Sequence, residues 1–369
     1  MRPLLPLLAA LLHPPRTHAS SNYTNPIVSE AGVDLGDPGA IFVDGFYYLA
    51  TSSGDTADAF PIHRSADLAS WSRAGAVFPQ WKAARNPAWA QADFWAPDLQ
   101  KVNSTHFAVY FSANFKGLLS LGVAFSRSVT GPYVDSGRPL WANHSDPEGT
   151  IDVHMHQRSA ATGGGKFLLW KANQNVGRLE LKARIQMQRL SDDGAALVGA
   201  AWTVATADQA WETFGCVEAP WLVEHAGDLF LFYSGSMVNW PLTSYAVGVA
   251  RAPRRGAGGI EQLWEKRTAG PILRRCGHRP PPVRAVEAES AGAAGTGLVP
   301  GHCSVLPVQQ STERGGGQDG EPRWVMFYHG RADAKSADRV LMMEELRWGS
   351  DGWPYVDGGC PSNISTPVP

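Results

Sequence analysis

The chain has 369 residues, a formal net charge of −2, 44% hydrophobic residues and 18% charged residues. These values indicate a folded globular protein and exclude a disordered chain. The near balance of charge gives no reason to expect nucleic acid or a membrane as a partner, and we expect a monomer.

The first 19 residues predict a secretory signal peptide, which lies outside the fold. Arg2 supplies the positive start, the stretch Leu4–Leu12 is apolar, and Thr17–Ala19 places small residues near a cleavage point. The apolar stretch is too short to span a membrane. Four Asn-x-Ser/Thr sequences agree with a secreted, extracellular glycoprotein, at Asn22, Asn103, Asn143 and Asn363.

Secretion makes disulfide bonds chemically accessible. The four cysteines are Cys216, Cys276, Cys303 and Cys360. Four cysteines allow three pairings, and the spacing alone does not choose among them.

Short strand-like runs, separated by Gly, Pro, Asp and Asn, fill the rest of the chain and predict an all-β fold. One aromatic and aliphatic run recurs five times, in 45–52, 105–112, 165–170, 227–234 and 322–329. The third residues of these runs are 60, 60, 62 and 95 positions apart. A second strand follows each run at a similar distance, beginning at Ile62, Val123, Ile185, Val247 and Leu341.

Five such units predict a five-bladed β-propeller that forms a single domain over residues 20–369. The longer last interval contains residues 276–297, which are rich in Pro, Gly and Ala and are interpreted as a surface insertion. The alternative is a pair of β-sandwich domains, and the nearly constant spacing argues against it.

In a propeller the first strand of each blade lines the central channel. The segments that precede the five runs place Asp37, Asp152, Glu218 and His302 there, with 95–98 (Trp-Ala-Pro-Asp) in blade two. Carboxylates that meet at one end of the axis shift each other's pKa values apart, as acid/base chemistry requires. Ordinary structural roles stay open: Asp37 and Asp152 also suit turns, and His302 also suits a hydrogen-bonded core position.

A second arrangement of polar residues lies beside Asp152. Asp152, His154 and His156 alternate along the chain, so a strand would direct them to one side. A metal site and a hydrogen-bonded polar face are both compatible with this pattern, and the second is favoured because no Cys or further carboxylate lies nearby.

Several motifs in order give the chain a family resemblance. They are Asp37–Gly39, Ser65–Trp71, Phe94–Asp98, Ser126–Tyr133, Glu218–Pro220, Pro300–Val305 and Arg339–Pro354. With these motifs the sequence resembles glycoside hydrolase family 43 over nearly the whole mature chain. The chain departs from the family pattern after Asp152, where it reads Val-His-Met-His-Gln, and at Cys303.

The resemblance implies a five-bladed propeller glycosidase that inverts the anomeric centre. It assigns Asp37 as the general base, Glu218 as the general acid, and Asp152 as the third carboxylate, which raises the pKa of the acid and holds it in place. Inversion needs two carboxyls about 6.5–9.5 Å apart, so that a water fits between the base and the sugar.

The resemblance also implies a set of substrate-binding residues, Trp95, His302 and Arg339. Trp95 resembles the wall of a sugar pocket, and His302 resembles an axial histidine that in some members helps to hold a calcium ion. No cofactor is otherwise required. Because Cys303 follows His302 and Cys216 precedes Glu218 closely, we also expect that these two cysteines could form a disulfide.

The resemblance favours release of α-L-arabinofuranosyl residues from plant arabinan or arabinoxylan. The segment 60–67 resembles small arabinose-releasing members, and little chain follows Trp353, where larger β-xylosidases append another module. A β-D-xylosidase and an endo-arabinanase are the alternatives. A non-catalytic carbohydrate-binding propeller is the alternative of another class, and the presence of all three carboxylates favours an enzyme.

Overall fold

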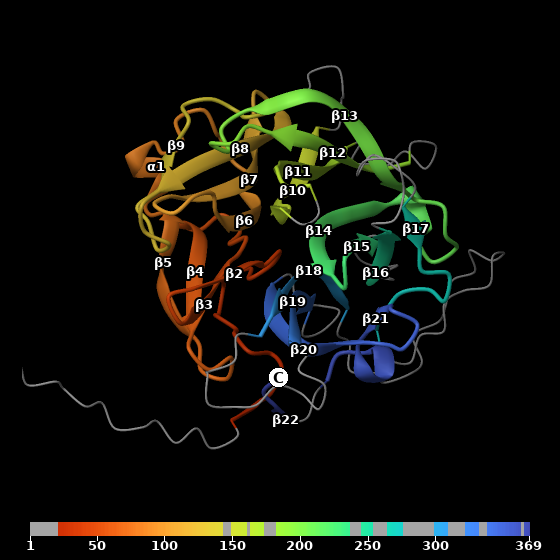
Figure 1. Cartoon of the computed structure of the whole chain (residues 1–369). Helices are drawn as coiled ribbons and strands as arrows, with labels where there is room; N and C mark the ends of the chain where they lie inside the picture. The colour runs from red at the N-terminus through yellow and green to blue at the C-terminus, as the bar shows by residue number, and fades with distance from the viewer. Residues whose placement is uncertain are drawn as a thin grey trace, which may run out of the picture.

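A computed structural model gives the architecture of the chain (Figure 1). It describes residues 21–142, 149–160, 163–172, 182–236, 245–253, 264–275, 299–308, 322–331, 338–362 and 365–369. The predicted signal peptide, the insertion 276–297, Cys276, Asn143 and Asn363 lie outside the described residues.

Five antiparallel sheets of four strands each surround a central axis, which confirms the predicted five-bladed β-propeller (Figure 1). In every sheet the strands follow chain order from the axis outward. Their bounds are β2 Gly39–Val43, β3 Phe46–Ala50, β4 Ala59–Ser65 and β5 Ser72–Phe78 in blade one; β6 Trp95–Lys101, β7 Phe107–Phe115, β8 Leu118–Ser126 and β9 Val134–Asp135 in blade two; β10 Thr150–Gln157, β11 Lys166–Ala172, β12 Arg184–Leu190 and β13 Leu197–Thr206 in blade three; β14 Val217–His225, β15 Asp228–Gly235, β16 Ala246–Ala252 and β17 Glu265–Lys266 in blade four; and β18 Pro300–Pro307, β19 Trp324–Arg331, β20 Arg339–Trp348 and β21 Pro354–Tyr355 in blade five.

The recurring aromatic runs form the second strand of each blade, where both faces of the sheet are covered. Phe111 on β7 and Phe232 on β15 are completely buried, as expected for strands between two neighbouring sheets. The buried side chains gather into five clusters in the described residues, one between each pair of adjacent blades. Apolar packing between blades therefore holds the ring together and fixes the inner strands around the axis.

The last blade meets the first through the N-terminal segment. Strand β1 (Asn22–Tyr23) pairs with β22 (Thr366–Pro367), and Val28 bridges to Leu341 on β20. The Asn25 side chain donates to the Met343 carbonyl at 2.9 Å and accepts from the Met343 N–H at 2.9 Å. The first and last described segments of the chain are thereby tied to blade five.

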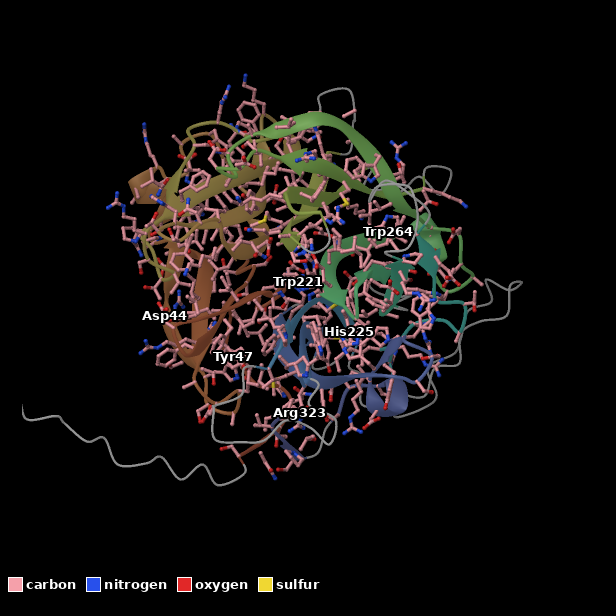
Figure 2. All side chains as sticks on the ribbon, viewed as in Figure 1. Asp44, Tyr47, Trp221, His225, Trp264 and Arg323 are labelled. Atoms are coloured by element: carbon pink, nitrogen blue, oxygen red, sulfur yellow. The ribbon has the colours of Figure 1, made fainter. Side chains whose placement is uncertain are left out.

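Helical structure is limited to α1 (Trp81–Ala84) and two 3-10 turns, η2 (Thr213–Gly215) and η3 (Asp357–Gly359), in the described residues. Accordingly, the described part of the chain contains no helix that is long and apolar enough to cross a membrane. Figure 2 shows how side chains fill the space between the blades, with Trp221 near the axis and Trp264 toward the outer edge of blade four.

Candidate active site

One left-handed residue marks the inner strand of every blade, or the segment just before it. These residues have φ between 48° and 58°, and they are Asp37, Ala96, Asp152, Ala219 and His302. In blades two to five a β-bulge accompanies the left-handed residue. Bulges redirect side chains, and strained non-glycine positions concentrate at functional sites. The repeated left-handed residue brings Asp37, Asp152 and His302 themselves to equivalent places around the axis, and it brings Glu218 as the neighbour of Ala219.

Asp37 is a buried carboxylate surrounded by cationic and hydroxyl donors. Arg339 Nη1 lies 2.6 Å from its Oδ1, His302 Nδ1 lies 3.1 Å from the same oxygen, and Ser52 donates to Oδ2 at 2.7 Å. Burial alone would raise the pKa of Asp37, but Arg339 and His302 hold it well below the ordinary value. Asp37 is therefore ionised, which is the form that accepts a proton from water.

Two histidines flank Asp37 in different protonation states. The Asp37 backbone N–H donates to Nδ1 of His329 at 3.1 Å, so this nitrogen carries no proton. Burial, followed by the nearby Arg339, lowers the pKa of His329 to about 4. Burial would likewise lower the pKa of His302, but Asp37 and the other carboxylates raise it. His302 is thus a cationic neighbour of Asp37, whereas His329 is neutral.

Glu218, on β14, forms an ion pair that the sequence did not suggest. The Nζ of Lys171, on β11 of blade three, lies 2.6 Å from Glu218 Oε2. The hydroxyl of Tyr245 also hydrogen-bonds Glu218. Burial would raise the pKa of Glu218, but Lys171 outweighs it and lowers the pKa. In this structure Glu218 is therefore ionised and oriented by Lys171.

Asp152 holds the proton that Glu218 lacks. It is buried on β10, and its Oδ2 accepts the N–H of Ala219 at 3.1 Å. Burial, with the charges of Glu218 and Asp37, raises the pKa of Asp152 to about 7. The resemblance implies the opposite order, with the raised pKa on Glu218. The cation of Lys171 reverses that order, and Asp152 and Glu218 share one proton.

Trp95 occupies the place in blade two that Glu218 has in blade four. Each residue immediately precedes the left-handed residue of its blade, and each pairs with a serine of the second strand, Ser112 or Ser234. The Trp95 residue is 37% exposed, although most tryptophans in the described residues are more buried. An accessible indole beside a cluster of carboxylates provides an apolar face for a ring to stack on.

Comparison with known proteins gives this site its context. A family model described as glycosyl hydrolases family 43 matches residues 23–274. The chain belongs to glycosyl hydrolase family 43. The comparison with curated protein sequences gave no match.

Solved structures of family-43 fold resemble the chain over most of its length. A thermostable family-43 glycoside hydrolase aligns with a TM-score of 0.73 at 24% identity, covering 94% of this chain and 99% of that one. An endo-1,4-beta-xylanase from Bacteroides thetaiotaomicron gives 0.65 at 22% identity, with 91% and 96% covered. An alpha-L-arabinofuranosidase from Lactobacillus brevis gives 0.64 at 18% identity, with 94% and 98% covered. At these identities the likeness shows the fold alone.

Arg339 of this family-43 protein is committed to carboxylates of the chain itself. Its Nε and Nη2 bind Asp34 at 2.8 and 2.7 Å, while its Nη1 binds Asp37. The resemblance implies a substrate-binding arginine, whereas these contacts give Arg339 a role in holding Asp37. Asp34 is the second carboxylate that holds the Arg339 guanidinium, and it was not predicted from the sequence.

Gly36 leaves the space in which the Arg339 guanidinium lies. A Cβ at position 36 would lie 1.9 Å from Cζ of Arg339, which cannot move without leaving Asp34 and Asp37. We therefore expect Gly36→Ala to lower the free energy of unfolding by about 1–3 kcal/mol and to reduce activity. Urea denaturation and steady-state kinetics measure the two effects. Gly45→Ala is the control for lost stability alone: a Cβ at position 45 meets no atom within 4 Å, but the left-handed backbone there, with φ 81°, strains an alanine, so this variant should lose stability and keep its kcat. An unchanged Gly36→Ala variant would contradict the assigned contact.

The predicted calcium ion finds a poor set of ligands near His302. Calcium prefers oxygen ligands, but His302 and Arg339 contribute cations, and both oxygens of Asp37 already accept hydrogen bonds. No group of three or more His, Cys, Asp or Glu side chains suited to a metal ion occurs among the described residues, so neither His302 nor the pair His154 and His156 belongs to one. The described donors do not fit calcium, and no step below depends on it.

The expected pairing of Cys216 with Cys303 is wrong. Both thiols are free and buried, and the half-buried Cys360 also has a free thiol. Cys216 Sγ instead lies 3.5 Å from both Lys171 Nζ and Glu218 Oε2. Cys303 belongs to the apolar cluster between blades four and five, whereas Cys216 faces the ion pair of Lys171 and Glu218, so the two side chains lie in different surroundings.

The two histidines next to Asp152 pack against blade four. The rings of His154 and Trp221 stack with centroids 4.2 Å apart, and His156 Nε2 lies 3.5 Å from Glu224 Oε1. His154 departs from the favoured hydrogen-bonded polar face, because neither of its ring nitrogens has a hydrogen-bond partner among the described residues, although Nδ1 lies 3.4 Å from Asp98 Oδ2.

Proposed function

We propose that this family-43 protein is a secreted, inverting glycosidase that releases α-L-arabinofuranosyl residues from arabinan or arabinoxylan. The observation that carries the proposal is the charge arrangement: Asp37 is ionised, while Asp152 and Glu218 share one proton. Family membership supports hydrolysis of a glycosidic bond. An alpha-L-arabinofuranosidase is among the structures of similar fold, as are a xylanase and a xylosidase, so the choice of arabinose rests on the resemblance of the segment 60–67 to small arabinose-releasing members.

In the proposed reaction Asp37 takes a proton from a water molecule, whose oxygen forms the new bond to the anomeric carbon. The bond from that carbon to the leaving oxygen breaks, and Glu218 gives the leaving oxygen its proton. Arg339 and His302 keep Asp37 anionic until it accepts the proton of water. Substrate covers the channel and excludes water, which favours the neutral form of Glu218, and the proton of the Asp152–Glu218 pair is the one transferred.

A β-D-xylosidase is the second candidate. A xylan beta-1,4-xylosidase from Bacillus halodurans has a similar structure, with a TM-score of 0.68 at 18% identity, and this chain spans 59% of it. An endo-arabinanase is a further alternative, and an inactive carbohydrate-binding propeller is the alternative of another class. The exposed Trp95 suits sugar stacking in all of these cases.

Purified protein tested on a panel of substrates distinguishes these functions. We expect hydrolysis of an aryl α-L-arabinofuranoside and of linear arabinan, with slower hydrolysis of an aryl β-D-xyloside. Proton NMR of the first product formed should show the inverted anomer. Initial retention of configuration would contradict the two-carboxylate mechanism, faster xyloside hydrolysis would favour the xylosidase, and binding of arabinan without hydrolysis would favour the inactive propeller.

A further inference from the structure

A ring of side-chain caps joins each blade to the next one around the axis. A residue of the second strand, or just after it, accepts the backbone N–H of the left-handed residue of the following blade. The four caps of this kind are Ser52 to Ala96 at 2.9 Å, Ser112 to Asp152 at 3.2 Å, Ser234 to His302 at 2.8 Å, and His329 to Asp37 at 3.1 Å. Each cap fixes the left-handed residue at the inner end of the following blade.

Lys171 occupies the equivalent position in blade three. Ile151, just before the left-handed Asp152, pairs with Lys171, as Glu218 pairs with Ser234 in blade four. A lysine ammonium has three donors and no acceptor, so it cannot cap the N–H of Ala219. That N–H donates to Asp152 Oδ2 instead. Because blade three has a lysine at the cap position, the carboxylate of Asp152 accepts the Ala219 N–H in its place.

The amine that replaces the cap turns toward blade four. Lys171 is buried, and its Nζ lies 2.6 Å from Glu218 Oε2. Its second contact, at 3.5 Å, is with Cys216 Sγ. The presence of Lys171 at the cap position of blade three thus has two consequences. It places a cation beside Glu218, and it leaves the Ala219 N–H to be accepted by Asp152.

We propose that Lys171 is a positioning residue for the reaction. It holds Glu218 in place through the ion pair. Because it does not accept the Ala219 N–H, that N–H binds Asp152 and so connects Asp152 to the strand that carries Glu218. The proposal rests on the proposed function, because it assigns Lys171 a part in the same proton transfer. Lys171 acts through Glu218 and Asp152: it contacts Glu218 and Cys216 directly, and it interacts with Asp152 through its charge.

The electrostatics of the cluster agree with this role. Burial would lower the pKa of Lys171, but Glu218 and Asp152 raise it, so the amine stays charged. A cation at hydrogen-bond distance favours the ionised form of a carboxyl and leaves the shared proton on Asp152. Removing the cation should raise the pKa at which the pair loses its proton. An opposite charge at this range commonly shifts a pKa by about 1–3 units.

Two variants separate the cation from the missing cap. Lys171→Met removes the charge and offers no acceptor, whereas Lys171→Ser restores the hydroxyl found in blades one, two and four. We expect the alkaline limb of kcat/KM, which reports loss of the shared proton, to move upward by about 1–3 pH units in Lys171→Met. In Lys171→Ser it should move further, because a serine that caps Ala219 also takes an N–H donor away from Asp152. Lys171→Arg retains the positive charge, so its limb should stay closer to that of wild type than the limbs of Lys171→Met and Lys171→Ser.

Lys266→Met is the matched control for loss of a buried lysine. Lys266 Nζ lies 2.6 Å from Glu212 and 2.8 Å from Asp208, in blade four away from the axis. The Lys266→Met variant should have a lower melting temperature than wild type and an unchanged pH profile of kcat/KM. If Lys171→Met and Lys171→Ser also lose stability while their pH profiles match wild type, Lys171 has only a structural role and the proposal is overturned.

An infrared titration tests the lysine without relying on turnover. Wild type should show a carboxylic acid band that disappears near pH 7 and is absent from Asp152→Asn. In Lys171→Met the acid band should persist to higher pH, and in Lys171→Ser to higher pH still. If the wild type hydrolyses no glycoside, the proposed function fails, and this titration alone decides the role of Lys171. Acid bands that titrate at the same pH in wild type and in both variants would overturn the proposed role of Lys171.

Discussion

Asp37→Asn is expected to lower kcat by roughly 10²–10⁴-fold on every substrate, whatever its leaving group, because the general base acts on water and not on the leaving oxygen. The asparagine keeps the size of the side chain, and its one oxygen can still accept the hydrogen bond from Arg339, while its NH2 group faces the Ser52 hydroxyl, which can accept. It cannot take a proton from water. Steady-state kinetics on a series of aryl arabinofuranosides with phenols of different acidity measures the effect.

Asp34→Asn is the matched control for this substitution. Asp34 binds the same guanidinium through two hydrogen bonds, and its removal leaves Asp37 in place. We expect a much smaller loss of kcat in Asp34→Asn, with a comparable loss of thermal stability. Equal losses of kcat in the two variants would show that the damage comes from a displaced Arg339, and the base would have to be sought elsewhere.

The fold could be predicted from the sequence because the repeat is a property of the strands themselves. Buried second strands require aromatic and aliphatic residues, and their spacing of 60, 60 and 62 residues is visible in the chain. The places of Asp37, Asp152 and Glu218 followed from the same repeat, since each stands before a recognisable strand. The pairing of Cys216 with Cys303 failed because proximity to the axis does not determine the direction of a thiol.

The electrostatic partners of the site could not be predicted in the same way. Lys171 directly follows the apolar run 165–170, and nothing in the sequence there shows that a bulge on β10 places it opposite Ile151. The bulges depend on left-handed residues such as Ala96 and Ala219, which no residue preference reveals. The one sequence feature that could have revealed this ion pair is the lysine itself, because it is a charged residue at a position where three other blades carry serine.

Glu218→Gln is expected to affect substrates unequally. Glutamine keeps the shape of the side chain but has no acidic proton, so a leaving sugar alkoxide goes without protonation. We expect kcat on arabinan to fall by roughly 10²–10⁴-fold. An aryl arabinofuranoside with a strongly acidic phenol should lose far less, because its leaving oxygen departs without a proton. The ratio of the two rates, measured in one preparation, gives the result independently of the fraction of active protein.

The same ratio separates Glu218 from Asp152 as the group that meets the leaving oxygen. Asp152→Asn removes the carboxyl that carries the shared proton in this structure and keeps an oxygen to accept the Ala219 N–H. Since Glu218 remains able to take a proton from solvent, Asp152→Asn should reduce both rates and change their ratio little. A leaving-group dependence that is steep in Asp152→Asn and flat in Glu218→Gln would exchange the two roles. In that case the ion pair with Lys171 would mark Glu218 as a permanently charged group that orients the substrate, and Asp152, with a pKa of about 7, would be the acid.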